Sequence, residues 1–184
     1  MDPATVFFTD FRCSDAENLQ RKFTRLLKTA GLAELDLARK FVAIKTHFGE
    51  GGCLAYLRPN WAKTLVDFVK AQGGRPFLTD ANTLYVGRRK DALEHLELAW
   101  ENGFSPFSVG CPILIADGLR GTDDVAVPLP DSLGITVFSL RLAPQTVHSS
   151  CLMPVASLVA ALSITHWKLC AAVSALSRHS HSCQ

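Results

Sequence analysis

Residues 41–50 read FVAIKTHFGE, an apolar run followed directly by polar and glycine residues around His47 and Glu50. A continuous apolar run of this kind is typical of a strand buried in a parallel sheet. Residues 76–85 and 112–123 repeat the same passage from apolar to polar residues. Because parallel strands end at a common edge of their sheet, where open α/β folds bind ligands, the sequence predicts a ligand site at this edge.

Helical patterns separate the apolar runs. Strands are predicted at residues 6–9, 41–44, 76–79 and 112–116, with weaker and antiparallel pieces at 125–127 and 135–138. Helices are predicted after Ser14, Pro59 and Arg89, with Gly31, Gly73 and Gly103 at their ends, and the third has Leu93, Leu96 and Trp100 on one face. Strands and helices in this order predict a three-layer α/β fold with a mainly parallel sheet and helices on both faces.

Composition narrows the class of protein. The chain has 184 residues, of which 48% are hydrophobic and 20% charged, with a net charge of +2, so an ordinary globular domain is expected. No basic cluster exceeds residues 88–90, which argues against nucleic acid and membrane partners. The start shows no basic segment followed by an apolar stretch, so a cytoplasmic location is predicted. The six cysteines are widely spaced, and we predict no metal site from them.

The loops after the predicted strands supply the candidate site residues. We expect catalytic roles for four of them, Lys45, His47, Asp80 and Asp117, because an amine, an imidazole and carboxylates can move protons and balance charge. Six further residues are expected to bind the ligand: Glu50, Arg58, Asn82, Thr83, Arg120 and Asp123. Arg88 and Arg89 would line the same rim. The predicted partner is a small anionic ligand.

Simpler structural roles remain open for the same residues. His47 can be an ordinary hydrogen-bonded loop histidine, while Asp80 and Asp117 can each cap the turn that follows a strand. Arg58 can form a surface ion pair. Whether the protein is an enzyme or a ligand-binding scaffold without catalysis is therefore undecided from the sequence.

Several ordered segments carry a family resemblance. They read VAIKTHFGE at 42–50, YLRP at 56–59, GRPFLTDANTLY at 74–85, HL at 95–96, ENGF at 101–104 and PILIADGLRGTD at 112–123. Over residues 5 to 130, these segments resemble the N-terminal part of the domain-of-unknown-function 362 family. The resemblance implies a prokaryotic, cytoplasmic protein of unassigned biochemistry.

The resemblance also implies a redox connection for longer members of the family. Many of them carry a ferredoxin-like segment with four-iron cluster motifs. This chain lacks the cluster cysteines, so we expect no cofactor in it, and a ferredoxin-like module or partner is expected only by analogy with the longer relatives.

The chain departs from the family pattern after Pro130. Residues 131–184 contain one acidic residue, three basic residues and ten serines. Such a poorly charged stretch is unusual for a globular surface, so residues 1–130 are predicted as the α/β domain and 131–184 as a divergent tail from a truncated or frame-shifted gene. The alternatives are a genuine helix over 155–176 that packs on the sheet and, less well supported by its length, a membrane span.

Overall fold

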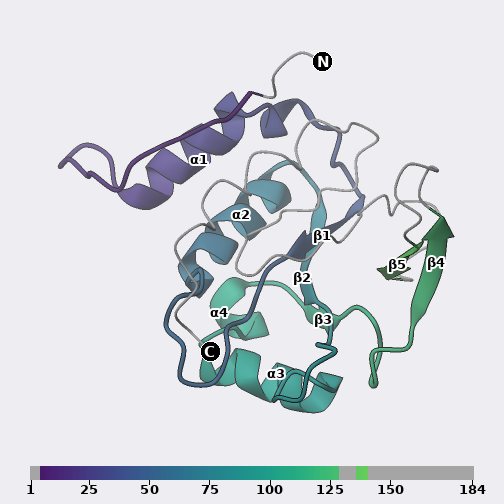
Figure 1. The fold of residues 1–184 in the computed structure, drawn as a ribbon. Helices are drawn as coiled ribbons and strands as arrows, with labels where there is room; N and C mark the ends of the chain where they lie inside the picture. Colours follow the sequence, from purple (N-terminus) through teal and green to yellow (C-terminus); the bar gives the residue numbers. More distant parts are fainter. Residues whose placement is uncertain (1–4, 129–135, 141–184) are drawn as a thin grey trace.

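The computed structural model describes residues 5–128 and 136–140 of the 184-residue chain (Figure 1). The helices of this part are α1 (Leu19–Thr29), the 3-10 helix η1 (Leu32–Glu34), α2 (Pro59–Ala71), α3 (Ala92–Glu101) and α4 (Pro106–Val109). The strands are β1 (Phe41–Lys45), β2 (Arg75–Asp80), β3 (Ile113–Ile115), β4 (Asp124–Pro128) and β5 (Thr136–Leu140). Helices and strands alternate up to β3, as they do in α/β proteins.

Strands β1, β2 and β3 form a parallel sheet with β2 in the middle. The register pairs Ile44 with Leu78, and Leu78 with Ile113. A crossover containing α2 joins β1 to β2, and a crossover containing α3 joins β2 to β3. The predicted α/β class with a parallel sheet is therefore confirmed.

The buried core lies on one face of this sheet. It combines side chains of the strands and of α2, among them Val42, Ile44, Leu78, Ile113, Leu65, Val66 and Val69. Because successive strand residues point to opposite faces, Phe41 and Leu114 lie on the other face, where they are 69% and 47% exposed. Helices on both faces, the three-layer part of the prediction, are not confirmed.

Helix α2 begins where the sequence indicates. Pro59 occupies the first turn, where its missing N–H costs no hydrogen bond, and Gly73 follows the helix with a φ of 76°. Trp61 is only half-buried and meets the rings of Phe11 and Phe23 edge to face, with centroids 6.1 and 5.4 Å away. The helix thus presents its aliphatic residues, more than its tryptophan, to the sheet.

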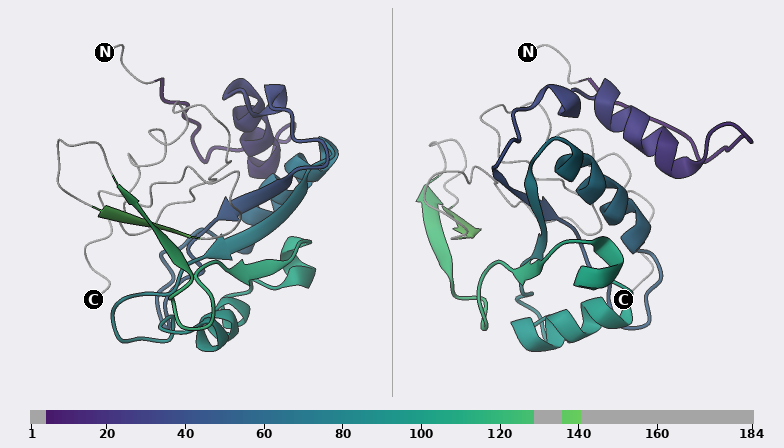
Figure 2. Two further views of the ribbon diagram at one scale, coloured as in Figure 1. Left: turned by 90° about the vertical axis from the view of Figure 1, so that its right-hand side faces the viewer. Right: turned by 180° about the vertical axis from the view of Figure 1, so that it is seen from behind.

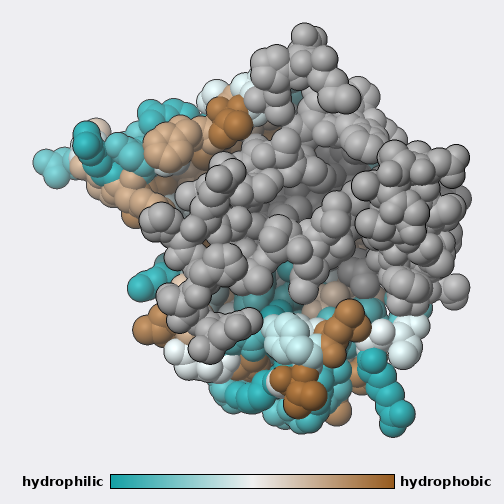
Figure 3. Space-filling view, in the orientation of Figure 1, coloured by the Kyte–Doolittle hydropathy of each residue, from teal (hydrophilic) through white to brown (hydrophobic). Residues whose placement is uncertain are grey.

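Helix α3 is rotated relative to the prediction. Asp91 caps it by accepting hydrogen bonds from the backbone N–H groups of the next turn. Its buried residues are Ala92, His95, Leu98 and Ala99. Leu93 and Trp100, which were expected on the core side, are 65% and 54% exposed, so that part of the prediction is wrong. Apolar side chains are correspondingly visible at the α3 end of the molecule (Figure 3).

The N-terminal segment also differs from the prediction. No strand forms over residues 6–9, where Val6 and Phe8 are 56% and 77% exposed. Helix α1 starts at Leu19 instead of near Ser14, because the side chain of Asn18 accepts the backbone N–H of Arg21 and provides the cap. The predicted strand and helix start are therefore wrong here.

Strands β4 and β5 form a separate antiparallel hairpin, as predicted. In Figure 1 and in the view from behind in Figure 2, the parallel sheet lies between this hairpin and helices α1 and α2. The predicted tail spans residues 131–184, and apart from β5 it falls on residues outside the described part of the chain, as do the alternatives for 155–176.

Candidate functional site

The carboxyl ends of the parallel strands converge as the sequence predicts. Lys45 ends β1, Asp80 ends β2, and Asp117 follows β3 by two residues. The backbone pairing continues past the strands, because the N–H of Thr46 donates to Thr79 O at 3.0 Å and that of Ala116 donates to Asp80 O at 2.9 Å. This pairing brings the three loops to one edge of the sheet.

Asp80 is the centre of a buried group of charges. Its side chain is 4% exposed, and Oδ1 lies 2.8 Å from Lys45 Nζ, while Oδ2 lies 3.5 Å from Arg89 Nη1. The backbone N–H of Ala81 also donates to Oδ1, at 2.9 Å. Burial alone would raise the pKa of Asp80, but His95 and the charge of Lys45 outweigh it and hold the pKa below its usual range. Asp80 is thus an ionised carboxylate in the folded domain.

Arg89 connects this carboxylate to the glycine-rich loop after β1. Its side chain is also only 4% exposed, and its Nε donates to Glu50 Oε1 at 2.7 Å. The hydroxyl of Tyr85 donates to the same oxygen of Glu50. Although partial burial opposes it, hydrogen bonds from Arg89 and Tyr85 lower the pKa of Glu50. Arg89 was expected to line the rim of the site, but its side chain is buried and paired with Glu50. Arg88 points elsewhere and pairs with Glu101.

His47 is held in one tautomer. Its Nδ1 accepts the backbone N–H of Gly49 at 2.8 Å. Burial, together with the positive charge of Arg89, lowers the pKa of His47 to about 4. The imidazole is therefore neutral at pH 7 with its single proton on Nε2, where it can donate a hydrogen bond.

Asp117 and Asn82 fasten the loops after β3 and β2 to each other. Both carboxylate oxygens of Asp117 lie 3.0 Å from the backbone N of Asn82, and Asn82 Nδ2 donates to Gly118 O at 2.9 Å. Burial raises the pKa of Asp117. Thr83 N donates to Arg89 O at 2.8 Å and closes the loop ahead of α3. Asp117 thus fastens two loops to each other, which is a structural role different from the turn cap that the sequence offered as the alternative to catalysis.

Two of the expected ligand residues are exposed at the margin of this edge. The backbone N–H of Asp123 donates to Asp117 O at 2.9 Å, while the side chains of Arg120 and Asp123 face solvent. They are available to a ligand but are not part of the buried charge group.

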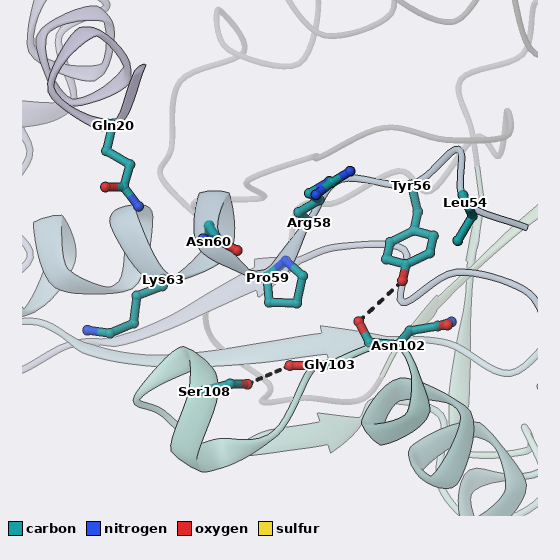
Figure 4. Close-up of a pocket in the computed structure, with 10 residues that line it drawn as sticks. All are labelled: Gln20, Leu54, Tyr56, Arg58, Pro59, Asn60, Lys63, Asn102, Gly103 and Ser108. Carbon is teal, nitrogen blue, oxygen red and sulfur yellow. Dashed lines mark hydrogen bonds between the residues drawn. The ribbon is translucent and has the colours of Figure 1, made fainter. Parts of the chain in front are cut away.

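Arg58 lies in a different place, at an open cleft in front of helix α2 (Figure 4). The cleft has a volume of about 580 Å³. Its lining residues are Gln20, Leu54, Tyr56, Arg58, Pro59, Asn60, Lys63, Asn102, Gly103 and Ser108. Tyr56 donates to Asn102 O at 3.3 Å, and Asn102 Nδ2 in turn donates to Phe48 O at 2.9 Å. The cleft thus adjoins the β1 loop without containing its charged residues.

Metal ligands do not gather in the described residues, where no group of three or more His, Cys, Asp or Glu is placed to hold an ion. Cys13 is exposed, Cys53 is half-buried, and Cys111 is buried, which raises the pKa of its thiol. None of the three is disulfide-bonded.

The sequence interpretation missed the part played by Arg89 and His95 in the charge group. A signal for His95 was present, because Ala92 and Ala99 stand three residues before and four residues after it and place it on a face of small residues. Small residues on a helix let it approach the sheet closely, and this face is the one that is buried. Arg89 shows no comparable pattern.

Comparisons with known proteins agree with the resemblance seen in the sequence. No curated protein and no solved structure matches this chain. Among the described helices, none combines the length and the apolar character needed to cross a membrane. A model of the family described as "Domain of unknown function (DUF362)" matches residues 42–156, which is more than half of the chain and extends past the predicted boundary at Pro130. The chain therefore belongs to the DUF362 family.

Proposed function

We propose that the edge formed by the ends of β1 and β2 binds a small anionic ligand through Lys45 and His47. The observation that carries this proposal is the partial exposure of Lys45. Its side chain is 22% exposed, whereas the neighbouring cation Arg89 is 4% exposed. An ammonium group held at a sheet edge, with access to solvent, is suited to contact a carboxylate or phosphate.

The hydrogen-bonding capacity of Lys45 supports this role. An ammonium group has three N–H donors, and the contact with Asp80 Oδ1 uses one of them. Asp80 also interacts with Arg89, so its negative charge is balanced by Arg89 as well as by Lys45. Lys45 can therefore direct its other donors to a ligand while it stays fixed by Asp80.

His47 is proposed as a second donor. Its Nδ1 lone pair is occupied by Gly49 N–H, so the proton available to a ligand is the one on Nε2. A neutral imidazole with its only acceptor atom occupied is a poor proton acceptor. This geometry favours ligand binding over acid–base catalysis by His47, and the function proposed for this edge is therefore binding.

Iron–sulfur chemistry is not part of this proposal. The resemblance connects four-iron clusters with longer relatives of the family, and no contact among the described residues favours such a cluster here. A ferredoxin-like partner stays an expectation from that resemblance.

The proposal can be tested by isothermal titration calorimetry of the full chain with inorganic phosphate and with succinate. We expect at least one of these probes to bind, and we expect Lys45→Met to weaken that binding by about tenfold or more, because the charge-assisted contact is lost. His47→Ala should weaken it less. Arg58→Met, which removes a cation at the open cleft, is the matched control and should leave the affinity unchanged.

Two results would contradict the proposal. One is the absence of binding by both probes to the unaltered chain. The other is a loss of affinity in Arg58→Met with none in Lys45→Met, which would place the anion in the cleft. Circular dichroism of each variant ensures that only folded proteins are compared.

A further inference from the structure

Thr79 carries a buried hydroxyl group at the edge where the candidate ligand site lies. It is the last residue but one of β2 and is 3% exposed. Within the part of the chain that the structure describes, its Oγ1 is shielded from solvent and has no hydrogen-bond partner. A buried hydroxyl without a partner destabilises a fold, so its presence at this edge calls for a partner that the described residues do not supply.

The strand register places this hydroxyl beside Lys45. Strands β1 and β2 run side by side (Figure 1), and Thr79 pairs with Lys45 on one side and with Leu114 of β3 on the other. Residues paired in this way point to the same face of a sheet, so the three side chains share the face opposite to the core. Asp80, the next residue, points to the other face, where its Oδ2 lies 3.6 Å from His95 Nε2. Thr79 therefore accompanies Lys45 and stands apart from the core side of the charge group.

The alternation of faces continues into the loop after β1. Thr46 is 1% exposed, and its backbone N–H donates to Thr79 O at 3.0 Å, so the chain keeps its extended pairing for one residue beyond the strand. His47 comes two residues after Lys45 and therefore falls on the same side of the sheet edge as Lys45 and Thr79. An ammonium group, an imidazole N–H and a hydroxyl thus share one side of this edge.

We propose that Thr79 is a third binding residue of this site and that its hydroxyl donates a hydrogen bond to an oxygen of the bound anion. The inference rests on the proposed function and extends it. It assigns to the orphan hydroxyl the partner that the ligand-free fold does not supply. It also restricts the ligand to an oxyanion with one oxygen for the ammonium group and another for the hydroxyl, as in a phosphate or a carboxylate.

The neighbours of Thr79 allow a ligand to approach. The short threonine lies between two longer side chains, those of Lys45 and Leu114, which are 22% and 47% exposed. The lysine side chain has a flexible four-carbon stem, so a small shift of it admits an anion to Oγ1 while the ammonium group stays in contact with the same anion.

The test compares the unaltered full chain with Thr79→Val, because valine has the shape of threonine without the hydroxyl. Isothermal titration calorimetry measures the binding of inorganic phosphate and of succinate, and urea unfolding is measured without either probe. We expect Thr79→Val to bind the probe about tenfold more weakly, the loss expected for one hydrogen bond to a charged group. Its unfolding midpoint should be unchanged or higher, because the hydroxyl has no partner to lose in the ligand-free fold.

Two further variants serve as controls. Thr79→Ser keeps the hydroxyl and should retain most of the affinity. Thr24→Val removes a threonine hydroxyl from α1, which contributes no residue to the edge, and Thr24 Oγ1 donates to Gln20 O at 3.0 Å. This variant should leave the affinity for the probe unchanged.

The outcomes separate this inference from the proposed function. If Lys45→Met weakens binding and Thr79→Val does not, the role of Thr79 is overturned while the anion site survives. A lowered unfolding midpoint in Thr79→Val would also overturn it, since the hydroxyl would then have a structural partner without any ligand. If neither probe binds the unaltered chain, the proposed function fails and this inference fails with it.

Discussion

At the strand ends, Asp80 and Arg89 are each 4% exposed and paired with other charges, whereas Arg58 at the start of α2 is exposed and borders an open cleft of about 580 Å³. The first region has fixed geometry and little space, and the second has space and fewer constraints on its side chains. Cleft volume alone would select the second. Pairing and burial select the first, since burying charges is costly and persists only where partners compensate for it. The size of a cavity and the precision of a polar site are thus separate properties in this domain.

The largest expected effect tests the burial of the charges. Arg89→Met should lower the free energy of unfolding by about 3 to 5 kcal/mol, because Glu50 loses its cationic partner and Asp80 loses one of its two, keeping only Lys45. Arg58→Met should change it by less than about 0.5 kcal/mol, as is usual for an exposed residue. Urea unfolding of the two variants measures both values. Equal losses would show that the two regions do not differ in the way described.

A smaller loss of stability is expected from a substitution of Gly49, which lies next to both regions. Its φ is +91°, and a Cβ there would lie 2.5 Å from Asn102 Nδ2 and 2.8 Å from Tyr56 Cδ1. We expect Gly49→Ala to cost about 2 kcal/mol of unfolding free energy, through backbone strain and displacement of the cleft wall. Gly51→Ala is the matched control, since nothing lies within 4 Å of its added Cβ. Thermal or urea unfolding that ranks the two variants equally would contradict the close contact.

The effect that is smallest near neutral pH comes from the protonation of His47. The pKa of His47 falls from 6.5 to about 4 in the folded domain, so between these values the unfolded chain binds more protons than the folded one. The contribution of neutral His47 to the free energy of unfolding is present above pH 6.5. It is lost as the pH falls towards 4, by at most about 1.4 kcal/mol per pH unit. Unfolding measured at pH 7, 6 and 5 should show a shallower slope in His47→Gln. An unchanged slope would mean that another group causes the dependence.

The central elements were predictable because local and tertiary signals agree in them. The apolar run of β1 is buried in the sheet, and Pro59 both permits and marks the start of α2. Agreement of this kind was missing at residues 6–9, where Val6 and Phe8 suit a strand but no neighbouring strand pairs with them in the described structure.

The candidate site was predictable as a location more than as a set of contacts. Strand polarity brings Lys45, His47 and Asp80 together, and strand polarity can be inferred from the order of the elements. The face of α3 could not be inferred from hydropathy, because His95 turns inward to meet Asp80 and Asn82 while Leu93 stays outside. Polar partners that are distant in sequence decided that rotation.

Asp80 is the last residue of β2 and pairs with Ile115 in the sheet. Neighbouring strand residues point to opposite faces, so a slip of β2 by one position would bring Thr79 to the place of Asp80. Arg89 would then lie buried without this carboxylate, which destabilises the misaligned sheet. A strand with only apolar side chains would not pay this electrostatic cost when it is misaligned. The charge group therefore selects the strand register, because the chain reaches its most stable state only when the sheet is assembled in the correct alignment.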